Sequence, residues 1–203
     1  RRMLAKQPGQ RPQDASTVLE EILRLQTGDA SQFVVHPALP DHAAADLVTA
    51  DYEWTLESSP AALWPYVSNT DRFNRAAGFQ AMTYDTTTDP DGRIRRFGQF
   101  RMAGMNLRWE EHPFEWVEGH RFSVLREFTG GPFVWFLSDV ELVPQPGGGT
   151  VLKHRVRIKP RGLVGRMFAR IELGTKNRLK FESIYRRIDR TIRGKGELTG
   201  LVD

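Results

Sequence analysis

The chain has 203 residues, of which 39% are hydrophobic and 27% charged, and its formal net charge is +4. These values are typical of a globular protein with a hydrophobic core, as one domain or one domain with an appendage. The absence of cysteine excludes disulfides and thiolate metal sites. No apolar run approaches the roughly 20 residues of a membrane-spanning helix and no secretory signal opens the sequence, so we expect a cytoplasmic protein. Because the sequence opens with Arg1, we also expect a piece of a longer protein.

Positive charge is concentrated near the end of the chain. Residues 153–195 hold fifteen Lys and Arg against three acidic residues, a balance of +12, and the remaining chain has a balance of −8. Such polarity could attract an anionic membrane or an acidic protein domain, or it could belong to solvated helix and strand faces. Few aromatic residues lie between the basic ones as stacking platforms, so we expect no nucleic-acid binding.

Residues 1–27 predict a short helix that ends before Pro8 and a second helix that starts near Asp14. Residues 28–48 have the composition of a linker, because glycine and proline interrupt any period. Two histidines in this linker lack the neighbouring acids or thiols of a metal site.

The main domain is expected at residues 49–193. It opens with an alternating strand near residues 51–56, followed by two short helices, one after the Ser59-Pro60 cap and one after Ser68. Period-two alternation between turn signals then predicts further antiparallel strands, at residues 81–87, 94–102, 105–111, 122–128, 134–142 and 150–159.

Residues 161–193 contain no proline and predict a long amphipathic helix. Its stripe follows steps of three and four along Ile171, Gly174, Arg178, Phe181, Tyr185, Ile188 and Ile192. Such a helix must bury its apolar stripe, and the sheet is the available surface. Residues 194–203 carry little pattern and read as a tail.

This order of elements resembles the helix-grip fold of the START/Bet v 1-like superfamily, also called SRPBCC, which includes polyketide cyclase/dehydrase-like domains. Two strings carry the resemblance, ALWPYVSNTDRF at residues 62–73 and RWEEHPFEW at residues 108–116. The resemblance implies an α+β domain in which a curved antiparallel sheet of about six or seven strands wraps on the C-terminal helix. The same strings are similar to the SRPBCC modules of bacterial signalling proteins that carry adenylate/guanylate cyclase domains.

The string MLAKQPGQRP at residues 3–12 resembles the end of a Ser/Thr protein kinase C-lobe. This resemblance implies a kinase domain upstream in the parent protein and no kinase activity here, because the glycine-rich loop, nucleotide lysine and catalytic Asp loop do not occur. The alternative is a helical hairpin that is only similar to the kinase end.

The helix-grip resemblance implies a cavity between sheet and helix that binds lipids, polyketides, hormones or other apolar molecules. In a minority of members it catalyses their cyclisation or dehydration. The side chains at the inward positions are large and apolar, as a site for an apolar ligand requires, although the same side chains could simply fill a core. We expect the lining to include Phe100, Met102, Leu107, Trp109, Phe122, Val124, Phe136, Val140, Ile171 and Tyr185.

Four polar residues also fall on faces expected to be inward. Glu111 and Arg126 lie on strands that we expect to be adjacent, so they could pair structurally or anchor a ligand carboxylate. His154 could be a hydrogen-bonded core residue or an acid/base group. Arg178 interrupts the helix stripe, where it could snorkel outward or reach into the cavity.

No catalytic triad, metal cluster or phosphate loop stands out in the sequence. We therefore expect a non-catalytic module that binds a small apolar or amphipathic ligand without a cofactor, as a sensor within a multidomain signalling protein. Two alternatives stay open. One is a polyketide cyclase/dehydratase-like enzyme that uses Glu111, Arg126 or His154. The other is a structural module without a cavity that contacts protein or membrane through residues 153–195.

Overall fold

The computed structural model describes residues 39–40, 42–69, 73, 82–90, 92, 94–102, 104–112 and 115–194. The helices expected in residues 1–27 lie outside the described residues, as do most of the linker, all but Phe73 of the second short helix, and the tail beyond Gly194. The domain boundaries drawn from the sequence therefore stay predictions.

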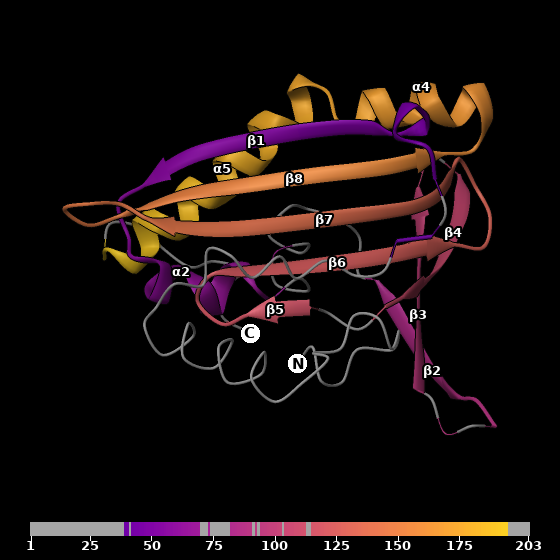
Figure 1. Cartoon of the computed structure of the whole chain (residues 1–203), viewed down its shortest axis with the longest axis horizontal. Helices are drawn as coiled ribbons and strands as arrows, with labels where there is room; N and C mark the ends of the chain where they lie inside the picture. The colour runs from indigo at the N-terminus through magenta and orange to yellow at the C-terminus, as the bar shows by residue number, and fades with distance from the viewer. Residues whose placement is uncertain are drawn as a thin grey trace, which may run out of the picture. The chain divides into compact units, whose positions relative to one another are not determined.

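The described residues form one antiparallel sheet with strand order β1-β8-β7-β6-β4-β3-β2, and β5 pairs with β6. The sheet bends between β6 and β4, so that β2 and β3 run steeply across the direction of β6, β7 and β8 (Figure 1). The strands are β1 Val48–Leu56, β2 Thr83–Thr88, β3 Ile94–Met102, β4 Met105–Glu111, β5 Glu115–Val117, β6 Arg121–Phe128, β7 Phe133–Pro144 and β8 Thr150–Pro160. The predicted α+β fold, a curved antiparallel sheet with a long C-terminal helical region, is confirmed.

Alternation places the side chains of β8 as the sequence predicts. Leu152, His154 and Val156 are buried on the inner face, whereas Lys153 and Arg155 are exposed on the other. Charged outer positions and apolar inner positions are the pattern of a sheet with one buried face.

The helices are the 3-10 turn η4 Ala44–Asp46, α2 Pro60–Val67, α4 Gly162–Glu172 and α5 Thr175–Ile192. The Ser59 hydroxyl caps α2 by accepting a hydrogen bond from the Ala62 backbone N–H at 3.4 Å, and Pro60 occupies the first turn. None of the described helices is long and apolar enough to cross a membrane.

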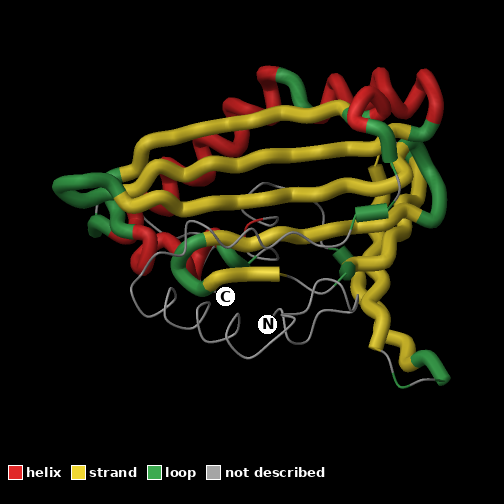
Figure 2. Tube along the Cα trace, in the orientation of Figure 1, coloured by secondary structure: helices red, strands yellow, loops and turns green. Residues whose placement is uncertain are grey.

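The C-terminal helical region consists of two segments, with a break at Leu173 and Gly174 (Figure 2). The Tyr52 hydroxyl donates a hydrogen bond to the Leu173 carbonyl at 2.8 Å, and the Asn177 amide donates to the Glu172 carbonyl. These side chains satisfy carbonyls that the end of α4 leaves without a helical partner. The sequence predicted one continuous helix here, because the segment has no proline and its apolar residues keep the helical period. Neither of these signals indicates the break.

The far end of α5 is held by Asp189. Its carboxylate accepts hydrogen bonds from the backbone N–H groups of Glu57 at 3.1 Å and Ser58 at 2.8 Å, in the turn after β1. Burial alone would raise the pKa of Asp189, but these hydrogen bonds outweigh it and hold the pKa below its usual value. Between the two ends, the buried side chains of Ile184, Tyr185 and Ile188 pack into the main core.

The outer face of the sheet carries a second apolar cluster. Leu125, Trp135 and Leu137 are buried there, and Leu39 and Leu47 pack against them. Part of the segment predicted as a linker therefore lies against the sheet.

The close approach of β3 to the Trp109 indole depends on a glycine. Gly98 lies directly opposite Trp109 in the β3–β4 register. A Cβ at position 98 would come within 2.3 Å of the Trp109 ring, which is itself only 1% exposed. The ring therefore occupies the volume that a side chain at position 98 would need.

We expect Gly98→Ala to lower the free energy of unfolding by about 1–3 kcal/mol, because the buried indole has little room to move. Gly130→Ala is the matched control: a Cβ there meets nothing within 4 Å, so its effect should stay within about 0.5 kcal/mol. Urea denaturation followed by tryptophan fluorescence measures both. Equal stabilities of the two variants would show that the ring is not confined.

Candidate ligand-binding cavity

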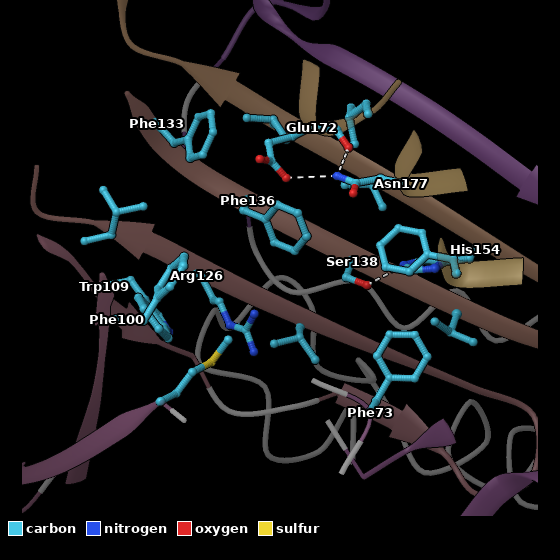
Figure 3. Close-up of a pocket in the computed structure, with 18 of the residues that line it drawn as sticks. Phe73, Phe100, Trp109, Arg126, Phe133, Phe136, Ser138, His154, Glu172 and Asn177 are labelled. Carbon is cyan, nitrogen blue, oxygen red and sulfur yellow. Dashed lines mark hydrogen bonds between the residues drawn. The ribbon is translucent and has the colours of Figure 1, made fainter. Parts of the chain in front are cut away.

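A cavity of about 160 Å³ lies between the inner face of the sheet and the start of α5. Its wall is largely aromatic and aliphatic, and side chains from the sheet and from the helical region point into it (Figure 3). Of the residues expected from the sequence, the structure brings ten together here: Phe100, Leu107, Trp109, Phe122, Val124, Arg126, Phe136, Val140, His154 and Tyr185. Met102 lies at the end of β3, but its side chain is outside the described part.

Two expected lining residues lie elsewhere. Ile171 is 63% exposed on α4, and Arg178 is exposed on α5. The break before α5 shifts the helical phase, so Ile171 does not continue the stripe of α5. On α5 the cavity-facing stripe runs from Phe181 back by four residues to Asn177, and Arg178 falls outside it.

Glu111 and Arg126 form an ion pair, the first of the two roles that their expected positions left open. Glu111 is buried beside the cavity, and its carboxylate accepts a hydrogen bond from Arg126 Nε at 2.9 Å. Arg96 lies 3.3 Å from the other carboxylate oxygen, so two guanidinium groups face one buried acid. Arg126 also lies over the Trp109 ring, 5.4 Å from its centre, and points from β6 toward the cavity interior (Figure 3).

The opposite end of the wall carries a hydrogen-bonded group around His154. Its Nε2 lies 2.9 Å from Ser138 Oγ, and its Nδ1 lies 3.1 Å from the Tyr185 hydroxyl. The Phe181 ring packs against the imidazole with centres 5.0 Å apart. Burial lowers the pKa of His154 from 6.5 to about 4, opposed in part by the charge of Asp139. Burial also raises the pKa of Tyr185, so both groups are neutral near pH 7.

The helix break supplies a third polar group at the wall. Glu172, Leu173 and Asn177 line the cavity, and the Asn177 amide donates a hydrogen bond to the Glu172 carboxylate at 2.9 Å (Figure 3). The polar lining residues that the sequence did not predict are Ser138, Glu172 and Asn177. Alternation did place Ser138 on the inward face of its strand. Asn177 lies four residues before Phe181, so helical spacing could have predicted it as a lining residue. No sequence signal predicts this role for Glu172.

Among the described residues, Glu110, His112 and Glu127 could hold a metal ion, because their ligand atoms lie within 4.8 Å of one another. Protein groups already engage them. Arg95 donates two hydrogen bonds to Glu110, and His112 Nε2 lies 2.7 Å from Glu127. Because Glu110 alternates with Trp109 and Glu111, it lies on the outer face of β4, away from the cavity.

The lowered pKa of His154 makes stability depend on pH. Between pH 6.5 and 4 the unfolded chain binds the proton that the folded chain excludes, so stability is full above the unfolded pKa and falls as the pH is lowered. We expect the free energy of unfolding to be about 2 kcal/mol smaller at pH 5 than at pH 7. Urea denaturation at both values tests this. In His154→Gln, most of the difference between the free energies of unfolding at pH 5 and pH 7 should disappear. If the difference is unchanged in that variant, groups other than His154 cause it.

No protein-family model matches the sequence, and no curated protein matches it. Solved structures do match. The Zhui aromatase/cyclase from Streptomyces sp. R1128 superposes with a TM-score of 0.52 at 12% identity, over 74% of this chain and 99% of that one. The di-domain ARO/CYC StfQ from the steffimycin biosynthetic pathway superposes with a TM-score of 0.53 at 12% identity, over 90% of this chain and 63% of that one. A START superfamily protein from Mycobacterium smegmatis superposes with a TM-score of 0.50 at 14% identity, over 71% of this chain and 98% of that one. At these identities the likeness concerns the fold alone, and the chain has the helix-grip fold that these START-like and aromatase/cyclase structures share.

Proposed function

We propose that this chain binds a small, mostly apolar molecule in the cavity between the sheet and α5, and that it does so without catalysing a reaction. The observation that carries the proposal is the cavity itself, with an apolar wall and a few polar groups at separate places. Ligand sites commonly combine these two features, because apolar contact supplies affinity and isolated polar groups set orientation.

The volume suggests the size of the ligand. A cavity of about 160 Å³ is close to the roughly 150 Å³ apolar cavity that holds benzene inside a protein core. Drug-sized ligands need roughly 300–1,000 Å³. A molecule with one ring, or with a short branched chain, therefore fits this cavity better than a polycyclic one.

We further propose that the module is sensory within a longer signalling protein in the cytoplasm. The kinase-like string at residues 3–12 supports this role, although it lies outside the described residues. The cavity also borders the α4–α5 break through Leu173 and Asn177. A bound molecule would contact the point at which the C-terminal helix changes direction, which offers a route from ligand to neighbouring domains.

A second candidate is an aromatase/cyclase-like or dehydratase enzyme. The neutral His154 ring next to Ser138 in a cavity wall favours it, since a neutral imidazole can act as a base. Glu111 suits the role less well, because Arg126 and Arg96 both engage its carboxylate.

For the binding proposal, we expect native mass spectrometry of protein purified from its host to show a co-purifying small molecule. Single-ring and short-chain compounds should raise the melting temperature, since a ligand at about 100 times its Kd stabilises by about 2.7 kcal/mol. Val140→Phe should remove this shift by filling the cavity. Val143→Phe, on the opposite face of β7, is the control and should bind as the wild type does. A clean apo spectrum together with no thermal shift would overturn the proposal.

For the enzyme candidate, turnover of a polyketide mimic should disappear in His154→Ala while circular dichroism remains that of the folded protein. Glu111→Gln extends the test to the carboxylate. Turnover that is unchanged in both variants would remove these roles, and absence of turnover in the wild type would remove the candidate.

A further inference from the structure

The His154 imidazole joins two hydroxyl groups, and the direction of each hydrogen bond decides what the cavity wall offers to a ligand. Ser138 Oγ lies 2.9 Å from Nε2, and the Tyr185 hydroxyl lies 3.1 Å from Nδ1. A neutral imidazole has one N–H donor and one nitrogen acceptor. Only two arrangements of the protons therefore satisfy both contacts at once.

In the first arrangement Tyr185 donates to Nδ1, and Nε2–H donates to Ser138 Oγ. In the second, Ser138 donates to Nε2, and Nδ1–H donates to the Tyr185 oxygen. The two differ in which hydroxyl hydrogen is left without an acceptor: that of Ser138 in the first, that of Tyr185 in the second.

Burial distinguishes the two arrangements. Tyr185 is only 2% exposed, and His154 is the hydrogen-bond partner of its hydroxyl among the described residues. A buried donor without an acceptor is strongly unfavourable, so Tyr185 donates to Nδ1. Nε2 then carries the hydrogen, and Ser138 Oγ accepts it.

Ser138 is placed differently from Tyr185. Both residues line the cavity, but Ser138 is only half-buried, and its side chain projects from β7 into the space next to His154 (Figure 3). Its own hydroxyl hydrogen is not used by His154 in this arrangement. A hydroxyl rotates about its C–O bond, so this hydrogen can turn toward a molecule in the cavity.

We infer that the Ser138 hydroxyl is a hydrogen-bond donor directed into the cavity, and that the ligand presents an oxygen acceptor of the carbonyl type to it. Tyr185 and His154 act as positioning residues that hold this donor in place. The inference rests on the proposed function, because it names the chemical class of the molecule that the same cavity takes.

Arg126 is a separate polar group on the same wall. In the β6–β7 register Arg126 lies opposite Phe136, so Ser138 is its diagonal neighbour, at about 7–8 Å. A single carbonyl oxygen within hydrogen-bond distance of Ser138 therefore does not need Arg126, and the two contacts can be tested independently.

The test compares acetophenone with cumene, which have the same number of heavy atoms and differ in that a carbonyl oxygen replaces a methyl group. Kd values are measured by isothermal titration calorimetry on the full chain. We expect the ratio of cumene Kd to acetophenone Kd to fall by about two- to tenfold in Ser138→Ala, the range of one hydrogen bond. Ser138→Cys keeps the side chain in place but offers only a weak S–H donor, so it should lower the ratio as well.

A spectroscopic measurement follows the positioning residues. The imidazole ¹⁵N shifts of His-labelled protein, assigned with His154→Gln, should show His154 neutral with its hydrogen on Nε2. Tyr185→Phe removes the donor that holds the hydrogen on Nε2, so the ¹⁵N shifts should show a mixture of the two tautomers. In the fraction with hydrogen on Nδ1, Ser138 donates to Nε2, which lowers the acetophenone preference without a change at Ser138. A purely structural role of Tyr185 would leave the tautomer and the preference as they are.

The outcomes separate the two proposals. If cumene and acetophenone bind and their ratio is the same in wild type and both Ser138 variants, the inference is wrong and the binding function stands. Hydrogen on Nδ1 in the wild type also overturns the inference. If neither compound binds the wild type, both proposals fall.

Discussion

The two ends of α5 are each held by β1 or by the turn that follows it, and these contacts set the position of the helix that forms one wall of the cavity. Tyr52 donates to the Leu173 carbonyl just before the helix, and Asp189 accepts from the Glu57 and Ser58 N–H groups near its end. Between these points the helix packs on the core through Ile184, Tyr185 and Ile188. These contacts fix the position of the helix against the sheet, and the cavity lies between the inner face of the sheet and the start of this helix.

The polar groups of the cavity wall are mostly engaged by other protein groups. Glu111 is held between two arginines, and His154 lies between two hydroxyls with its pKa lowered to about 4. Hydrogen-bonded groups of this kind hold their side chains in place, whereas Trp109 Nε1 in the same wall has no hydrogen-bond partner among the described residues. Side chains held in place suit a site that selects a molecule by shape and by one or two hydrogen bonds.

Much of the fold follows from the sequence because period-two alternation is a strong local signal. It placed His154 between Leu152 and Val156 on the buried face, and it put Glu111 and Arg126 where they could pair. The helix break did not follow, since one of the contacts that satisfy the backbone there comes from the Tyr52 hydroxyl, 121 residues away in the sequence. That break is also why Ile171 is exposed, and why Asn177 rather than Arg178 reaches the cavity. The proton arrangement around His154 needed the depth of burial at Tyr185, which a sequence does not measure.

The Gly98–Trp109 contact has a consequence for how this chain can diverge. The missing side chain at position 98 and the large indole at position 109 share one volume, so position 98 has little room for a side chain while the indole is present. A lineage gains a side chain at position 98 at the lowest cost in stability after it has lost the ring at position 109. Loss of the ring also widens the cavity, because Trp109 forms part of the wall. Substitution at one position of a strand pair would then be a route by which related chains come to accept larger ligands.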